Sequence, residues 1–168
     1  MEHQGARGVS LGGALSVLAV IGVLILVSLP RLQAFALAEN EADAAALTRV
    51  LGLELERAAE PGTGPTLPQL AGQAGLDVHD DVEWLDGGRI LRRHGYLFEL
   101  ALRPGGAALR AWPWAYGDTG RAAFAFRPAS GVLRHGNPEG AWTGPESAPP
   151  LDGGGWTPAA VEADPAAF

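Results

Sequence analysis

The first long feature of the chain is an uninterrupted apolar segment. Residues 9–29 read VSLGGALSVLAVIGVLILVSL and contain no charged side chain. At about 1.5 Å per residue, a helix of this length is about 30 Å long, which matches the hydrocarbon thickness of a bilayer. A helix that is apolar on every side is not typical of a soluble domain, where one face meets water. The segment therefore predicts a transmembrane helix.

Residues 30–60 are apolar on one side only. They are rich in Ala, Leu, Glu and Arg, which are strong helix formers, and Pro30 is expected to bend the helix without ending it. Pro61 and Gly62 then predict its end. An apolar stripe at helical spacing consists of Leu47, Val50, Leu51, Leu55 and Ala58, and a polar belt before it consists of Glu39, Asn40, Glu41 and Asp43. We expect an amphipathic continuation of the helix, packed on a domain.

Residues 61–135 predict a small globular domain. A proline- and glycine-rich loop at 61–68 leads into a short helix at 67–74. Short strands are expected at 82–85, 89–93, from 96 onward, at 109–116, 121–127 and 132–134, separated by turns at 86–88, 104–106, 117–120 and 129–131. These strands form an antiparallel meander, and the helix stripe is available to cover its apolar face. The predicted fold class is α+β, a long helix packed on a small antiparallel sheet.

The last segment, residues 136–168, is dominated by Gly, Pro, Ala and acidic residues. Such a composition predicts a mostly irregular, loose tail. Trp142 and Trp156 are expected to fold back onto the domain, or else to contact a partner.

Composition excludes several classes of function. The chain has a net charge of −7, no cysteine, and 12 basic residues that are all arginine. The absence of cysteine excludes disulfides, thiolate nucleophiles and Cys-ligated metals, and the absence of lysine excludes a P-loop or Schiff-base lysine. The acidic balance argues against nucleic acid as a partner.

The apolar segment has three interpretations. It is the core of a signal peptide cut at the site Ala36-Leu37-Ala38, or a plain single-pass anchor, or a processed pilin helix. The third interpretation rests on a cut after Gly8, which makes Val9 the first mature residue and places Gly22 at mature position 14 and Pro30 at position 22.

This arrangement resembles the leader of type IV pilins and type II secretion pseudopilins. In that family a short hydrophilic leader ends in Gly, about twenty apolar residues follow, and a proline often stands at mature position 22. The chain departs from the family at the first mature position, where Val9 replaces Phe or Met, and at the fifth, where Gly13 replaces a glutamate. Some minor pseudopilins at the filament tip also lack that glutamate.

A second resemblance lies in the predicted strands. GYLFEL from Gly95, AWPWAYGDTGRAAFAF from Ala111 and the following SGV are similar to the C-terminal part of small prepilin-like proteins. The residues that carry this domain motif are Gly95, Tyr96, Phe98, Trp112, Pro113, Tyr116, Gly117, Thr119, Gly120 and Phe124.

The resemblance implies a minor pseudopilin-type structural subunit and not an enzyme. Residues 1–8 would be a cytoplasmic leader removed by a prepilin peptidase, and 9–29 a single helix in the inner membrane, with the later domains extracytoplasmic. The new amino terminus could be methylated. Partners would be other pilin-like subunits or the secretion machinery, and helix packing would involve Gly12, Gly13, Ser16, Gly22 and Pro30. The alternative is an anchored extracytoplasmic binding module that does not polymerise.

Candidate chemistry is sparse, and no cofactor is expected. Asp77, Asp80, Asp81 and Asp86 are a weak candidate for calcium, because oxygen ligands cluster there without the spacing of an EF-hand. Three histidines are too scattered for a zinc site: His79, His94 and His135. The aromatic run Trp112, Trp114 and Tyr116 is expected to serve packing, and the basic spot Arg92-Arg93-His94 is expected to be a solvated strand end.

Overall fold

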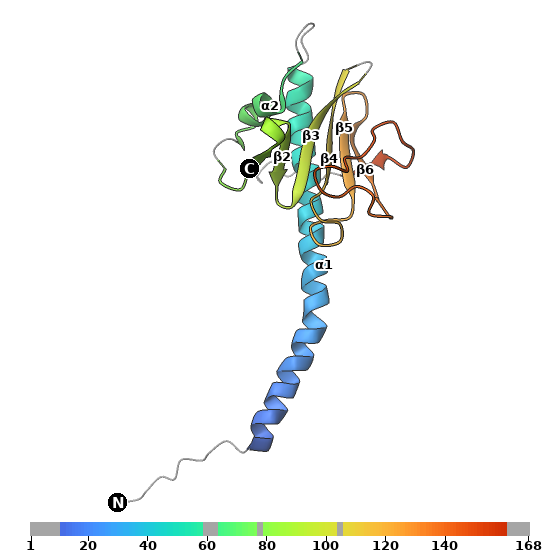
Figure 1. Ribbon diagram of the computed structural model, residues 1–168. Coiled ribbons are helices and arrows are strands. Elements are labelled where there is room, and N and C mark those ends of the chain that lie inside the picture. Colours follow the sequence, from blue (N-terminus) through green and yellow to red (C-terminus); the bar gives the residue numbers. More distant parts are fainter. Residues whose placement is uncertain (1–10, 59–63, 77–78, 104–105, 161–168) are drawn as a thin grey trace, which may run out of the picture. The chain divides into compact units, whose positions relative to one another are not determined.

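The computed structural model describes residues 11–58, 64–76, 79–103 and 106–160 (Figure 1). The chain divides into two compact units, Met1–Phe35 and Ala36–Phe168. Each unit is described by itself below.

Helix α1 (Leu11–Arg57) is 47 residues long and continues through Pro30 without a break. Within the first unit its large apolar side chains are exposed; Leu18 and Leu26, for example, are 64% and 73% exposed. The helix is long and apolar enough to cross a membrane, as the sequence predicted. It ends at Arg57, slightly before the expected residue 60, and Pro61 and Gly62 lie outside the described residues.

The second unit contains a seven-stranded antiparallel sheet in which each strand pairs with the next along the chain. The strands are β1 (Glu83–Leu85), β2 (Ile90–Arg93), β3 (Tyr96–Arg103), β4 (Gly106–Pro113), β5 (Ala123–Arg127), β6 (Gly131–His135) and β7 (Thr157–Pro158). A short helix, α2 (Leu67–Gln73), precedes the sheet, and a 3-10 turn, η2 (Asp86–Gly88), connects β1 to β2. The predicted meander is therefore confirmed.

One face of the sheet, here called the inner face, packs on α1 and α2. In an antiparallel pair, residues directly opposite each other lie on the same face of the sheet. Across strands β1 to β5, one row of opposed residues on the inner face consists of Trp84, Leu91, Phe98, Ala111 and Phe124. The predicted helix stripe meets this row: the buried helix side chains are Ala44, Ala45, Leu47, Thr48, Leu51 and Leu55. The α+β fold of a long helix packed on an antiparallel sheet is thus the observed fold (Figure 1).

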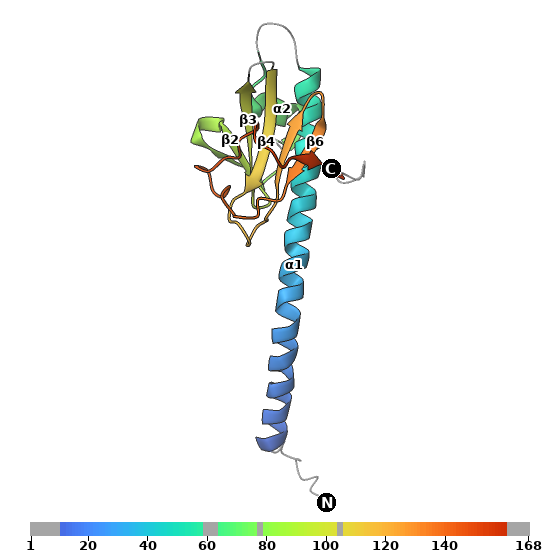
Figure 2. The same cartoon turned by 90° about the vertical axis from the view of Figure 1, so that its right-hand side faces the viewer.

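The opposite, outer face is covered by residues 136–160, here called the strap. Figure 2 shows the strap, in dark orange and red, running across the sheet. The indole rings of Trp142 and Trp156 are stacked with centroids 5.9 Å apart and pack against a cluster containing Leu97 and Trp112. The strap is mostly irregular, as expected. It is not loose, however, because large apolar side chains on the outer face need a cover.

The strands differ from the prediction in their boundaries, most of all at β4, and in one additional short strand. β4 begins at Gly106 and ends at Pro113, three residues before the expected 109–116, because the alternation of β3 continues across the hairpin from Arg103 opposite Gly106. Pro113 ends the strand, since it has no N–H for the ladder. The two-residue strand β7 was not predicted, because a Thr-Pro pair has no alternation to reveal it.

Candidate functional site

The exposed apolar surface of α1 is the first candidate for function. Its exposed large side chains within the first unit are Leu15, Val17, Leu18, Val20, Ile21, Val23, Leu24, Ile25, Leu26, Val27, Leu29, Leu32 and Phe35. The Ser16 hydroxyl donates a 3.0 Å hydrogen bond to the carbonyl of Gly12, so this polar group is satisfied within the helix. Exposed apolar area of this extent marks a surface that meets a membrane or a protein partner.

The residues expected to support helix packing all lie on α1. Gly12 and Gly22 have open space where a side chain would stand, and Gly13 and Pro30 lie on the same helix. The expected processing residues, Gly8 and Val9, lie outside the described residues.

The second candidate is the junction between α1 and the sheet, which is built from the polar belt. Glu41 accepts hydrogen bonds on one carboxylate oxygen from the backbone N–H groups of Arg121 (3.0 Å) and Ala122 (3.1 Å), and on the other from Arg134 (3.1 Å). Asn40 donates to the carbonyl of Thr119 at 3.0 Å. Asn40 and Glu41 of the predicted belt therefore connect the helix to residues 119–122, which lead into β5, and to β6.

The domain motif supplies the other half of this junction. The buried Tyr96 hydroxyl donates a 3.0 Å hydrogen bond to the carbonyl of Ala122. A side chain on Gly120 would overlap the Tyr96 ring, and one on Gly95 would stand 2.6 Å from Cβ of Thr119. Gly95 also has a φ of 73°, which favours glycine. These motif residues hold two turns in close contact and present no reactive group.

The remaining motif residues serve packing. Phe98 and Phe124 lie in the inner core, whereas Trp112 lies under the strap and donates a 2.6 Å hydrogen bond to the carbonyl of Gly144. Pro113 closes β4, and Gly117 donates to the carbonyl of Gly120 at 2.9 Å. In the aromatic run, Trp114 packs against the same cluster as Trp112, and the Arg92 guanidinium lies 4.3 Å from its ring centre. The Tyr116 hydroxyl instead donates a hydrogen bond to the carbonyl of Pro138.

The predicted calcium ligands are not brought together. Asp81 accepts a 2.8 Å hydrogen bond from Arg93, which is the main cause of a lowered pKa of the Asp81 carboxyl. Asp86 pairs with Arg89 at 2.7 Å, Asp80 is exposed, and Asp77 lies outside the described residues. Within the described ranges, no group of three acidic or histidine side chains is arranged to hold a metal ion.

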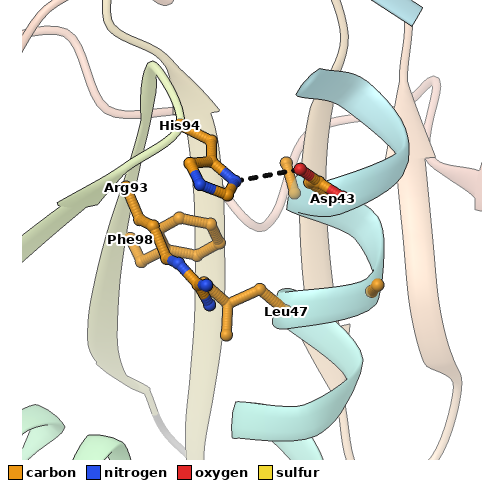
Figure 3. Close-up of a pocket in the computed structure, with 7 residues that line it drawn as sticks. Asp43, Leu47, Arg93, His94 and Phe98 are labelled. Atoms are coloured by element: carbon orange, nitrogen blue, oxygen red, sulfur yellow. Dashed lines mark hydrogen bonds and ion pairs between the residues drawn. The ribbon is translucent and has the colours of Figure 1, made fainter. Parts of the chain in front are cut away.

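A small pocket lies between α1 and the turn from β2 to β3. It is lined by Asp43, Leu47, Arg93, His94 and Phe98, and Figure 3 shows the His94 ring facing the Asp43 carboxylate. Its volume of about 70 Å³ is small beside the several hundred Å³ of a ligand site. The basic spot lies at the end of β2, where His94 is exposed, as expected of a solvated strand end, and Arg92 and Arg93 are half-buried. Each of its three side chains pairs with a carboxylate.

The other two histidines are separate from this pocket. His135 lies beside the stacked rings of Trp142 and Trp156, with its centroid 4.4 and 5.5 Å from theirs, and its Nδ1 accepts a hydrogen bond from the backbone N–H of Asn137. His79 is exposed in the segment before β1.

The sequence analysis did not predict two contacts of the second unit. Gly52 is buried where α1 crosses Phe126, and its signal was a glycine within a run of strong helix formers. Glu99 is buried opposite Arg110, whose Nε donates to it at 2.8 Å. The corresponding signal was a carboxylate in an otherwise apolar strand.

Comparisons with known proteins add no relative: no protein-family model, no curated protein and no solved structure matches the chain. The fold and its contacts are therefore the basis for the function proposed below.

Proposed function

We propose that the chain is a pilin-like structural subunit of the minor pseudopilin type, without a catalytic role. The observation that carries the proposal is that one continuous helix has two different surfaces. Between residues 12 and 35 its apolar side chains are exposed, whereas from Ala44 to Leu55 its apolar stripe is buried in a folded domain. Such a helix suits a subunit that is anchored in a membrane and then packs with other helices.

The proposed pathway has three steps. A prepilin peptidase cuts after Gly8, and Val9 becomes the mature amino terminus, which is then methylated. The helix stays in the inner membrane, with the leader side cytoplasmic and the domain extracytoplasmic. It then packs against other subunits in, or at the tip of, a type II secretion or type IV pilus-like filament, where Gly12, Gly13 and Ser16 permit close approach of backbones.

The junction at Glu41 supports this role in assembly. A carboxylate that accepts three hydrogen bonds from the sheet side holds that part of the helix and the sheet as one body. The domain and the part of the helix within the second unit would then enter an assembly together, and the domain would carry the contacts to a neighbour or cargo.

An alternative function is an anchored extracytoplasmic binding module that does not polymerise. Gly13 favours this alternative, because it stands where the resembled family has the glutamate that pairs with a neighbouring amino terminus. Recovery of the chain in a filament fraction sheared from cells would support the subunit. Recovery only from the membrane fraction, as a monomer, would support the binding module.

The mature amino terminus is the decisive measurement for processing. Because the chain has no lysine, an amine-reactive label attaches only at the amino terminus, and mass spectrometry of the labelled protein from native membranes then identifies it. The variant Gly8→Leu is expected to remain uncut. Gly5→Leu is the matched control, since it changes another glycine of the same leader and should be cut normally.

The outcomes separate the interpretations. A start at Val9 in the wild type and in Gly5→Leu, but not in Gly8→Leu, supports the pilin-like subunit. A start at Glu39 would mean a secreted domain released after Ala38, and the proposal would be wrong. An intact Met1 or Glu2 in the wild type would leave the anchored module.

A further inference from the structure

The side chain of His94 lies between two carboxylates that belong to different parts of the second unit. Its Nδ1 is 2.9 Å from an oxygen of Asp43 on α1, and its Nε2 is 2.6 Å from an oxygen of Asp81 in the segment before β1. Figure 3 shows the first of these contacts, across the pocket that Leu47 and Phe98 also line. The histidine therefore connects three segments that are distant in sequence.

Both contacts together require a particular form of the ring. A neutral imidazole has one N–H and one lone pair, so it can donate to only one of the two carboxylates. The other ring nitrogen would then direct its lone pair at a carboxylate oxygen. A protonated ring donates at both nitrogens and satisfies both distances.

Charged groups from three segments surround the ring. Those that line the two pockets at His94 are Asp43 from α1, Asp80, Asp81 and Glu83 from the segment entering β1, and Arg92 and Arg93 from β2. Both guanidinium groups are engaged, Arg92 by Glu83 and Arg93 by Asp81, each at 2.8 Å. The hydrogen bond from Arg93 also lowers the pKa of Asp81, which keeps that carboxylate ionised in mild acid.

The backbone fixes where the ring stands. His94 and Gly95 form the two-residue turn between the paired residues Arg93 and Tyr96, and their φ angles are 45° and 73°. Such a turn needs positive φ at both positions, and among residues with a side chain, Asn, Asp and His are the ones enriched there. The ring is thus held at the helix by a turn of restricted geometry.

We propose that Asp43, His94 and Asp81 form a proton-dependent clasp between α1 and the turn from β2 to β3. The clasp is closed when the imidazole carries a proton, which histidine side chains gain and lose between about pH 5 and pH 8. Loss of the proton removes one of the two hydrogen bonds, so the hairpin holds the helix more tightly in mild acid than in mild alkali. This inference does not depend on the proposed function.

The test compares thermal unfolding of the full-length chain in non-ionic detergent micelles at about pH 5 and about pH 8. Tryptophan fluorescence is the readout, since all five tryptophans lie in the second unit. The main variant is His94→Asn, which keeps the turn geometry but cannot be protonated. His79→Asn is the matched control, because it removes an exposed histidine outside the clasp.

We expect the melting temperature of the wild type to exceed that of His94→Asn by about 3–6 °C more at pH 5 than at pH 8. Taking this difference cancels the pH dependence of other groups, including His135. An equal difference at both pH values, or a larger one at pH 8, would overturn the proposal. So would a His79→Asn variant with the same effect as His94→Asn.

A second variant keeps the test valid if His94→Asn does not fold. Asp43→Asn neutralises the half-exposed carboxylate on the helix and leaves the turn untouched. It is expected to lower the melting temperature at pH 5 and to change it little at pH 8. A larger loss at pH 8 would count against the clasp.

Discussion

Replacing Gly52 with alanine tests how closely the helix approaches the sheet. Gly52 is buried in α1, and an added Cβ would stand 2.6 Å from one ring carbon of Phe126 and closer still to two others. Phe126 is itself only 3% exposed, so its ring has little space into which it could move. The substitution therefore sets a better helix former against a steric overlap.

The sizes of these two opposing free energies decide whether Gly52→Ala stabilises or destabilises the domain. Alanine in place of glycine favours a helix interior by about 1 kcal/mol. Overpacking a core with one methyl group costs about 1–3 kcal/mol, and overlap with three ring atoms belongs at the upper end of that range. We expect Gly52→Ala to destabilise the domain by about 1–2 kcal/mol, which lowers its melting temperature by about 4–8 °C.

The matched control is the same substitution in α2. Gly72 is exposed, has nothing within 4 Å of an added Cβ, and does not have a positive φ. Gly72→Ala should therefore raise the melting temperature by about 2–4 °C, because only the helix preference acts there. Both variants are measured by tryptophan fluorescence on the full chain in micelles.

The result that refutes this reasoning is a Gly52→Ala variant that melts at or above the wild type while Gly72→Ala behaves as expected. A double-mutant cycle gives an independent measure. In a Phe126→Leu background the ring is gone, so Gly52→Ala should cost at least about 1 kcal/mol less than in the wild type. Additive effects of the two substitutions would contradict a direct contact.

Three further predictions concern polar groups. Glu41→Ala leaves the N–H groups of Arg121 and Ala122 without their acceptor and should cost about 1–3 kcal/mol in denaturant unfolding, whereas Glu41→Gln, which keeps an acceptor oxygen, should cost less. The lowered pKa of Asp81 means that its stabilisation is present above the ordinary value of 3.8 and is lost as pH falls through the lower folded value. The wild type should thus lose its advantage over Asp81→Asn as the pH falls below 3.8, and an advantage that keeps growing below that pH would contradict this. Burial raises the pKa of Tyr96 far above its ordinary value, so in a Tyr116→Phe variant, which keeps Tyr96 as its one tyrosine, tyrosinate absorbance should appear in alkali only when the domain unfolds; tyrosinate formation in the folded variant would refute the burial.

The fold could be predicted from the sequence where local patterns match the structure. The apolar run and the stripe at Leu47, Leu51 and Leu55 indicated the helix, and alternation from Tyr96 onward indicated the sheet. Turn residues such as Asp86-Gly87-Gly88 marked the hairpins. Each of these elements is determined by residues close together in the chain, so a single sequence is enough to predict it.

The contacts of the candidate site could be predicted only in part. The polar belt was recognised as a belt, but its partners at residues 119–122 are about eighty positions away, and no local pattern encodes such a pairing. The prediction of a loose tail was wrong for a related reason. The Gly and Pro content of the strap is typical of loose segments, whereas its order comes from the packing of Trp142, Trp156 and Leu151 on an apolar face of the sheet. Both the partners of the belt and the order of the strap depend on contacts between residues far apart in the sequence.

The two edge strands of the sheet determine whether copies of the chain at high local concentration can pair through their backbones. The strands at its borders are only three and two residues long, and one of them includes Pro158, which cannot donate a ladder hydrogen bond. At the other border Glu83 and Arg92 place opposite charges on neighbouring strands. Copies brought close together would therefore have little unpaired backbone with which to extend a shared sheet, and their contacts would be made by side chains, which can discriminate between partners.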